Sequence, residues 1–316
     1  MKMKRKIASG GWEFWVPYIG LVVVCILFGI LSEGKLFSAR NLKMLVNQVM
    51  PLLIICCGAA FYWAHGAIDL SVAGVLGVAC ITSALGFNTG SIFLAFLFPV
   101  LTAIIFGLAN GVISAILRLP SFLTSLCVMF IASGLLSYIA TSNIIKVTTD
   151  TSMVDNTVVK VIAMVIVVIV TYILFEYTTI GKSNKLIGGN PQAAHFSGIN
   201  VNRNKIIAFV VAAACIGIAA FFTTARAKSI GASTGNGMQF NVITAMVFGG
   251  MSFGGGKNAR ISNGVLGALT FTVLTNGMQL SGVGTDFVQL LKAVVFIIVV
   301  YMGCRNSVKG KSSILL

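Results

Sequence analysis

One stretch of the sequence decides the fold class, and it reads Ile206-Ile-Ala-Phe-Val-Val-Ala-Ala-Ala-Cys-Ile-Gly-Ile-Ala-Ala-Phe-Phe-Thr-Thr224. It contains no charged residue and approaches the roughly 20 residues that an α-helix needs to cross a bilayer. Nine other apolar stretches resemble it, at residues 15–32, 44–64, 69–87, 92–117, 121–141, 157–176, 239–256, 262–281 and 286–304. The sequence therefore predicts an all-α, polytopic membrane protein with about ten transmembrane helices. The segments 121–141 and 239–256 are short and bordered by proline or glycine, which favours half-spans or re-entrant pieces there.

The composition excludes an ordinary soluble protein. The chain has 316 residues, of which 57% are hydrophobic and only 9% are charged, against roughly 25% charged in soluble domains. The seven cysteines all lie in apolar stretches without ligand spacing, so we interpret them as small packing residues. They are Cys25, Cys56, Cys57, Cys80, Cys127, Cys215 and Cys304.

The net charge of +15 indicates membrane topology and lipid headgroup contacts rather than nucleic acid binding, because the basic residues flank the apolar stretches. With the N-terminus inside, most lysines and arginines of the connections fall on the cytoplasmic side. This bias predicts a cytoplasmic N-terminus at 1–14, a cytoplasmic tail at 305–316 and a cytoplasmic loop at 177–205. The single transmembrane domain would cover 15–304, with a retained first helix. Lys160 and Lys292 lie inside apolar stretches near an outer end, where their side chains can snorkel.

A polar island interrupts this apolar chain at residues 185–203. Asn190 is a good N-cap and Pro191 suits the first turn of a helix. Ala193 and Ala194 would then present a small face, and Gly198 can end the helix. Two interpretations are open: a short helix that docks into a groove of a soluble partner, or an ordinary capped helix in a loop.

Polar residues inside the apolar stretches are candidates for a solute path. Asp69 is an isolated carboxylate there, which is a functional hypothesis by default. It can equally cap the following helix or pair structurally. His65 is a possible partner of Asp69, and a free histidine at the membrane interface is the alternative. The neutral polar residues suit an uncharged, hydroxylated solute, although hydrogen bonds between helices would explain each of them equally well.

The sequence has no hydrolase constellation and no P-loop of its own. Residues 249–257 are rich in glycine, but the spacing GxxxxGK[ST] would require glycine where Met251 stands and Ser or Thr where Asn258 stands. The glycines instead suit a non-helical break lined by protein. The pairs Gly107-xxx-Gly111 and Gly250-xxx-Gly254 have helix-packing spacing.

Four segments in order resemble a family. They are Ala67-Ile-Asp-Leu-Ser-Val-Ala-Gly74, Asn110-Gly111 with Leu119-Pro-Ser-Phe-Leu-Thr-Ser-Leu126, Ile187-Gly-Gly-Asn-Pro-Gln-Ala-Ala-His-Phe-Ser-Gly-Ile-Asn-Val201, and Phe248-Gly-Gly-Met-Ser-Phe-Gly-Gly255. Together they are similar to the permease subunit of bacterial ATP-binding cassette (ABC) importers for monosaccharides, the ribose, xylose, galactose and autoinducer-2 group. The alanines at 67 and 73, Gln192, His195 and residues 256–260 depart from the family pattern.

The resemblance implies a non-enzymatic transport subunit of the bacterial cytoplasmic (inner) membrane. It would work with a second permease subunit, a cytoplasmic ATP-binding subunit that holds ATP and Mg, and an extracytoplasmic sugar-binding protein. The chain itself would hold no metal and no cofactor. Contact with the ATPase is expected at Gly189, Asn190, Pro191, Gln192, Ala193, Ala194, Gly198 and Ile199. The solute path is expected at Asn47, Gln48, Asp69, Ser71, Asn110, Ser121, Phe122, Thr124 and Asn276.

Three alternatives accompany this prediction. Permeases for branched-chain amino acids form a sister group with related motifs. A stand-alone secondary carrier or channel would move solute without ATP. A purely structural membrane subunit would tolerate substitutions in the expected path.

Overall fold

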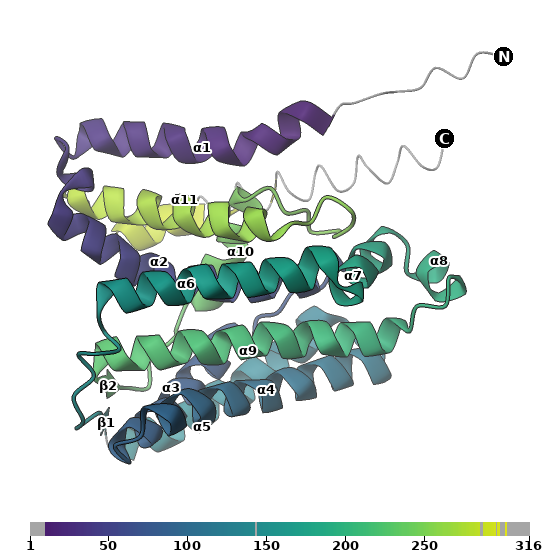
Figure 1. Cartoon of the computed structure of the whole chain (residues 1–316), viewed down its shortest axis with the longest axis horizontal. Coiled ribbons are helices and arrows are strands. Elements are labelled where there is room, and N and C mark those ends of the chain that lie inside the picture. Colours follow the sequence, from purple (N-terminus) through teal and green to yellow (C-terminus); the bar gives the residue numbers. More distant parts are fainter. Residues whose placement is uncertain (1–9, 143, 285–286, 295, 298–300, 302–316) are drawn as a thin grey trace.

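The computed structural model describes residues 10–142, 144–284, 287–294, 296–297 and 301. Most of these residues are helical, and the long helices run side by side along one axis (Figure 1). Among the described helices, five are long and apolar enough to cross a membrane: Ala39–Ala64, Ile92–Ile116, Ser121–Ala140, Thr157–Tyr177 and Val201–Ala227. An all-α membrane protein is therefore confirmed.

The first half of the chain supplies five long helices joined by short connections. In order they are α1 Gly10–Leu31, the 3-10 turn η1 Lys35–Phe37, α2 Ala39–Ala64, α3 Val72–Asn88, α4 Ile92–Ile116 and α5 Ser121–Ser142. Hydroxyl caps start two of them, since Ser38 Oγ accepts from the Asn41 N–H and Ser91 Oγ from the Leu94 N–H. Each helix overlaps a predicted apolar segment, because uninterrupted apolar length is a local signal.

The second half alternates long and short pieces. It contains β1 Ile145–Lys146, α6 Thr157–Tyr172, the π-helical turn η2 Ile173–Tyr177, α7 Thr179–Gly189, α8 Pro191–Phe196, α9 Val201–Ala227, β2 Ser229–Ile230, α10 Met238–Phe248 and α11 Ile261–Leu280. The strands β1 and β2 pair antiparallel, with Ile145 opposite Ile230. Residues 287–294 and 296–297 are helical as well.

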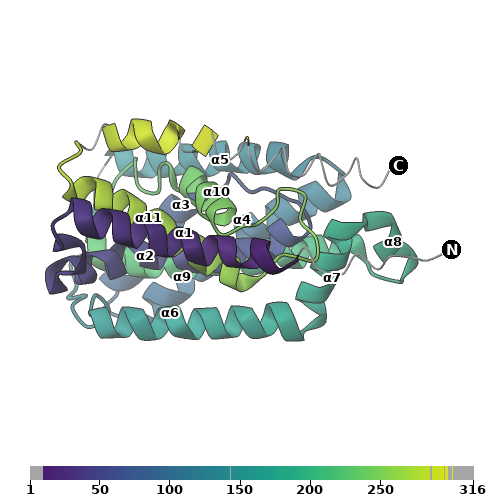
Figure 2. The same cartoon turned by 90° about the horizontal axis from the view of Figure 1, so that it is seen from above.

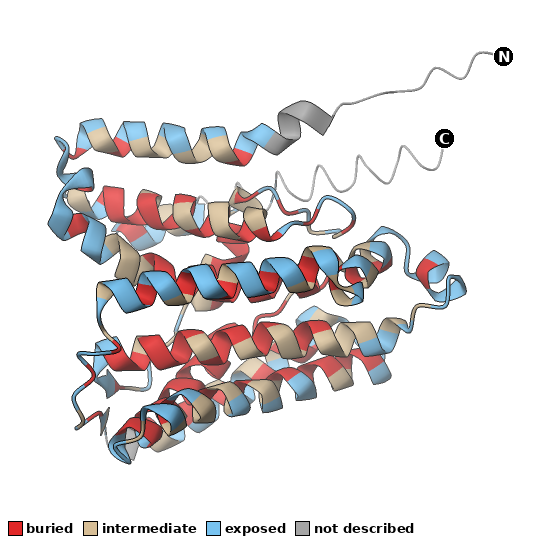
Figure 3. Ribbon diagram, in the orientation of Figure 1, coloured by how far each residue is buried: buried red, intermediate tan, exposed pale blue. Residues whose placement is uncertain are grey.

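Helices α2 and α9 form the centre of the molecule. The most apolar part of α2 is 67% buried and that of α9 is 61% buried, against 22% for α4 and for α6. Helix α9 packs on α2, α3 and α4. Large apolar side chains of the outer helices, such as Ile105 and Ile166, are exposed, and the ribbons of α4 and α6 carry many exposed residues (Figure 3). Seen from above, α5 and α6 lie on opposite sides with α2, α9 and α10 between them (Figure 2). Exposed apolar side chains on outer helices are what a lipid environment requires.

The predicted close approach at Gly107 and Gly111 is confirmed. A Cβ at Gly107 would overlap the side chain of Ala213, and one at Gly111 would lie 3.0 Å from Cα of Ile206. The pair Gly250 and Gly254 does not pack a helix, because α10 ends at Phe248 and both glycines lie in the irregular stretch that follows. That prediction was wrong, whereas the predicted non-helical break is confirmed.

The two predicted half-spans have different outcomes. Helix α10 has 11 residues, or about 16 Å, roughly half of a bilayer core. Helix α5 has 22 residues, so its length argues against a half-span. The predicted segments 1–14 and 305–316 lie largely or wholly outside the described residues, as do parts of 286–304.

Candidate functional site: the α7–α8 loop and three polar clusters

Helix α8 projects beyond the ends of the long helices (Figure 1). Asn190 caps it as predicted, since its Oδ1 accepts from the backbone N–H of Gln192 at 3.0 Å and of Ala193 at 3.1 Å. Pro191 occupies the first helical position. At the other end Gly198 adopts φ +83°, a left-handed conformation that glycine reaches without steric cost. The capped helix of the sequence prediction is confirmed.

The exposed face of α8 differs from the expected one. Ala193 is exposed, but Ala194 is buried, and its carbonyl oxygen accepts from the Ile199 N–H at 3.1 Å. The two alanines therefore do not form one open small face, because adjacent residues of a helix point about 100° apart. Phe196, which the sequence did not single out, is 90% exposed. Phe196 is thus an exposed aromatic ring on a helix that projects from the body of the molecule.

Helix α7 connects α8 firmly to the body of the protein. Lys185 Nζ lies 2.7 Å from Glu176 Oε2 and 4.7 Å from the ring centroid of the buried Phe175. His65 Nδ1 lies 3.2 Å from Asn184 Oδ1. His65 is thus a partner of α7 and not of Asp69, which corrects the expectation. The Lys185 contacts hold α7 against η2, and the His65 contact holds it against the C-terminal end of α2.

The carbonyl oxygen of Ala64, the last residue of α2, is a meeting point for two other segments. It accepts from the Gly256 N–H at 2.8 Å. A Cβ at Gly188, near the end of α7, would overlap the same oxygen. The loop that carries α8 and the glycine-rich break after α10 therefore meet at one position.

The first polar cluster surrounds Asp69. Its Oδ1 accepts from the Ser71 N–H at 2.8 Å, from Ser71 Oγ at 2.6 Å and from Asn110 Nδ2 at 3.2 Å. Asn110 Oδ1 in turn accepts from Thr124 Oγ1 at 3.0 Å. Asp69 is only 5% exposed. The carboxylate joins the α2–α3 connection to α4 and, through Asn110, to α5, which favours the structural interpretation of this residue.

Ser121 and Phe122 lie beside this cluster at the start of α5. Ser121 Oγ accepts from the Ile68 N–H at 3.4 Å, and its carbonyl oxygen accepts from Thr124 Oγ1 at 2.9 Å. Phe122 is half exposed. Ser121 therefore strengthens the contact between the α2–α3 connection and α5, whereas Phe122 points to the surface.

The second cluster lies between α2 and α11. Asn276 Nδ2 donates to Gln48 Oε1 at 3.2 Å, and Asn276 Oδ1 accepts from Asn41 Nδ2 at 2.9 Å. Both Asn41 and Asn276 are buried. Amide pairs of this kind join helices where no water is available.

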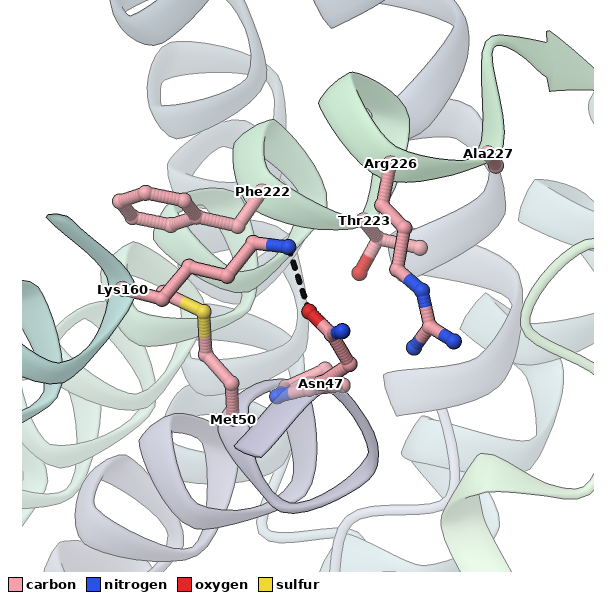
Figure 4. A pocket seen from close by; sticks show the side chains of 8 residues that line it. Asn47, Met50, Lys160, Phe222, Thr223, Arg226 and Ala227 are labelled. Atoms are coloured by element: carbon pink, nitrogen blue, oxygen red, sulfur yellow. Dashed lines mark hydrogen bonds between the residues drawn. The ribbon is translucent and has the colours of Figure 1, made fainter. Parts of the chain in front are cut away.

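The third cluster lines a cavity of about 260 Å³ between α2, α6 and α9, shown in Figure 4. Lys160 Nζ donates to Asn47 Oδ1 at 2.5 Å and pairs with Asp155. Its side chain is buried, so the expected snorkelling of Lys160 is wrong: an ion pair and an amide satisfy the ammonium inside the protein. Thr223 and Arg226 line the same cavity. The nine expected path residues thus fall into separate groups, which do not form one continuous wall.

Comparison with known proteins identifies the family of this chain. Residues 41–300 match the family model described as branched-chain amino acid transport system / permease component. The chain belongs to this permease family.

Curated relatives of the permease are named for sugars. It is 29% identical to the ribose import permease protein of Bacillus subtilis, over 97% of both chains. It is 30% identical to the galactofuranose transporter permease protein of Escherichia coli, covering 85% of this chain and 81% of the relative. It is 28% identical to the D-allose transport system permease protein of Escherichia coli, over 87% of each chain. No solved structure matches the chain.

Within the permease, sequence analysis missed residues that carry no isolated polar signal. Phe196 stands in a polar island, where an aromatic side chain is not unusual. Asn41 stands near the start of a helix rich in polar residues, so only its contact with α11 reveals it.

Proposed function

We propose that this permease is the membrane-spanning subunit of an ATP-driven importer of the bacterial cytoplasmic membrane that carries a monosaccharide. Membership of a permease family and the sugar names of the curated relatives support this function. In this proposal the chain hydrolyses nothing itself, and a separate cytoplasmic subunit binds ATP and Mg. A second permease subunit and a sugar-binding protein outside the membrane complete the importer.

The observation that carries the proposal is the projecting helix α8. It is held at its start by the Asn190 cap, fixed to the body through α7, and exposes the ring of Phe196. An aromatic anchor on a rigid support is the kind of residue that dominates a protein interface. We therefore assign α8 as the part of the chain that enters a groove of the ATPase.

The contacts of α7 supply a route from the ATPase to the membrane helices. A displacement of α8 would move α7, whose Asn184 and Lys185 contact His65, Phe175 and Glu176. The carbonyl of Ala64 would pass this movement to the turn before α11 through Gly256. A chain of packed and hydrogen-bonded groups is the physical medium that such coupling needs.

The proposed orientation places α8 in the cytoplasm. The first described residues of α1 lie at the same end of the molecule as α8, and β1 and β2 lie at the opposite end (Figure 1). Lys182, Lys185, Arg203 and Lys205 flank α8, which supports a cytoplasmic location by the positive-inside rule.

Truncation of the exposed ring tests the assignment. Phe196→Ala should reduce co-purification with the ATPase and sugar-stimulated ATP hydrolysis at least tenfold, because a central anchor is worth roughly 2 kcal/mol or more. Tyr138→Ala, which removes an 80% exposed aromatic of α5, is the matched control and should change neither. Assembly of the Phe196→Ala protein at the wild-type level would refute the docking role of α8.

Transport by reconstituted protein tests the class of solute and the energy source. Proteoliposomes with the permease, the ATPase and the binding protein should take up labelled D-ribose, D-allose or D-fructose only with ATP inside. Uptake of leucine instead would favour the amino acid branch of the family. Uptake by the permease alone, down a gradient, would favour a secondary carrier or channel.

A further inference from the structure

A second, larger cavity is lined by none of the residues of the three polar clusters. It has a volume of about 560 Å³ and is bounded by the start of α10, by α11 and by the helical residues 289–294 and 296–297. This volume lies within the range of about 300–1,000 Å³ that is usual for ligand pockets. None of the path residues expected from the sequence lines it.

Two kinds of side chain line this cavity. Asn236 and Asn241 belong to the start of α10 and the loop before it, and Gln289 and Lys292 belong to the helical residues 287–294. Each amide can both donate and accept a hydrogen bond, and the ammonium donates. These groups match a neutral sugar. Its hydroxyl and ring oxygens accept hydrogen bonds, and its hydroxyl groups also donate them.

Aromatic rings supply the rest of the lining. Phe240 is half exposed, and its centroid lies 5.6 Å from that of Phe296 in an edge-to-face arrangement. Lys292 Nζ lies 5.5 Å from the ring centroid of Phe271, a distance at which cation and ring attract. The combination of aromatic faces with a few convergent polar groups is typical of small-molecule sites.

The cavity also lies where the backbone is interrupted. The loop before α10 contacts the first turns of α3, because a Cβ at Gly235 would lie 2.6 Å from the Ala73 carbonyl oxygen. Helix α10 then runs for only 11 residues. Irregular backbone at membrane depth is tolerated where it is covered by protein or lines a water-filled cavity, and interrupted helices build solute sites in transporters.

We propose that this cavity is where the permease contacts its solute, a neutral monosaccharide. The inference rests on the proposed function and deepens it. Asn241 binds hydroxyl groups from the α10 side and Gln289 from the helical residues 287–294, Lys292 donates to a ring or hydroxyl oxygen, and Phe240 covers the apolar face of the sugar ring.

Sugar uptake and ATP hydrolysis, measured together in proteoliposomes of the complete importer, test the site with labelled D-ribose, D-allose and D-fructose. Asn241→Ala and Gln289→Ala should each lower uptake at least tenfold while ATP hydrolysis stays within twofold of wild type. Uptake per ATP therefore falls, because the solute loses its contacts while the ATPase still docks. Gln279→Ala, which removes an exposed amide at the end of α11 outside the cavity, is the matched control and should leave both rates unchanged.

Two results would overturn the inference. One is uptake within twofold of wild type in both cavity variants, and the other is a fall of uptake and ATP hydrolysis in parallel. If Asn241→Ala is lost from the membrane, Gln289→Ala and Phe240→Leu carry the same test at other lining residues. Failure of the wild-type importer to take up any of these sugars would count against the proposed function itself, so the two failures are distinguishable.

Discussion

The Asp69 cluster and the α10–α11 cavity place polar groups within an apolar protein in opposite ways. In the cluster the carboxylate oxygen already accepts three hydrogen bonds from Ser71 and Asn110. In the cavity Asn241 and Gln289 line an open volume of about 560 Å³. Polar groups that satisfy one another stabilise a fold, whereas groups that face a cavity are available to a solute.

The difference shows why isolation in an apolar stretch is an incomplete guide to function. A polar residue isolated in an apolar stretch must be either buried against protein or solvated in a solute path. Both outcomes keep its polar side chain away from lipid. Only the contacts of each group distinguish them. Substitutions in the Asp69 cluster should therefore lower the stability of the protein, whereas substitutions in the cavity should lower sugar transport.

The largest effect is expected from Asp69→Ala. The change leaves the Ser71 N–H, the Ser71 hydroxyl and the Asn110 amide without their acceptor, at about 1–3 kcal/mol for each buried group. The protein should largely disappear from the membrane fraction. Asp69→Asn keeps an acceptor oxygen at the same place, so it should retain most abundance and sugar uptake. Normal abundance of Asp69→Asn with loss of uptake would instead assign the charge to transport and remove the contrast.

An effect on the cavity side is expected from Gly267→Ala. A Cβ at Gly267 would overlap the Ala245 carbonyl oxygen, and Phe271 follows one turn later in the wall of the cavity. Overpacking of this kind costs about 1–3 kcal/mol, and uptake per ATP should fall as α10 and α11 separate.

Gly134→Ala on α5 is the control for that substitution, because nothing lies within 4 Å of the added Cβ. Thermal unfolding in detergent should show a midpoint below that of wild type for Gly267→Ala and an unchanged midpoint for Gly134→Ala. Equal midpoints for both variants would mean that the α10–α11 contact is looser than the structure indicates.

The smallest effect is expected from Thr124→Val, which keeps the shape of the side chain and removes the hydroxyl that donates to Asn110. One buried hydrogen bond contributes about 1 kcal/mol, so the midpoint should fall slightly and sugar uptake per ATP should not change. A selective loss of uptake would show that this cluster, too, contacts solute.

The sequence predicted those features that depend on neighbouring residues. The helices follow from apolar length, and the cap of α8 follows from Asn190 beside Pro191. Contacts between distant segments could not be predicted from it. Asn41 and Asn276, for example, are hydrogen-bonded although they are 235 positions apart. The exposed side of α8 was also missed, because six residues give no periodicity from which to choose between Ala194 and Phe196 as the buried side chain.

The π-helical turn Ile173–Tyr177 has a consequence for how the elbow between α6 and α7 tolerates change. A π-turn accommodates one residue more than the α-helical path, and one residue corresponds to about 100° of rotation about the axis. The direction in which α7 leaves α6 is therefore set by the number of residues in the turn more than by their identity. Removing Ile173, Leu174 or Phe175 would rotate α7 about the axis of α6 and carry Asn184 away from His65, whereas exchanging one for another of similar size would not, a contrast that a deletion and substitution scan of 173–175 would measure.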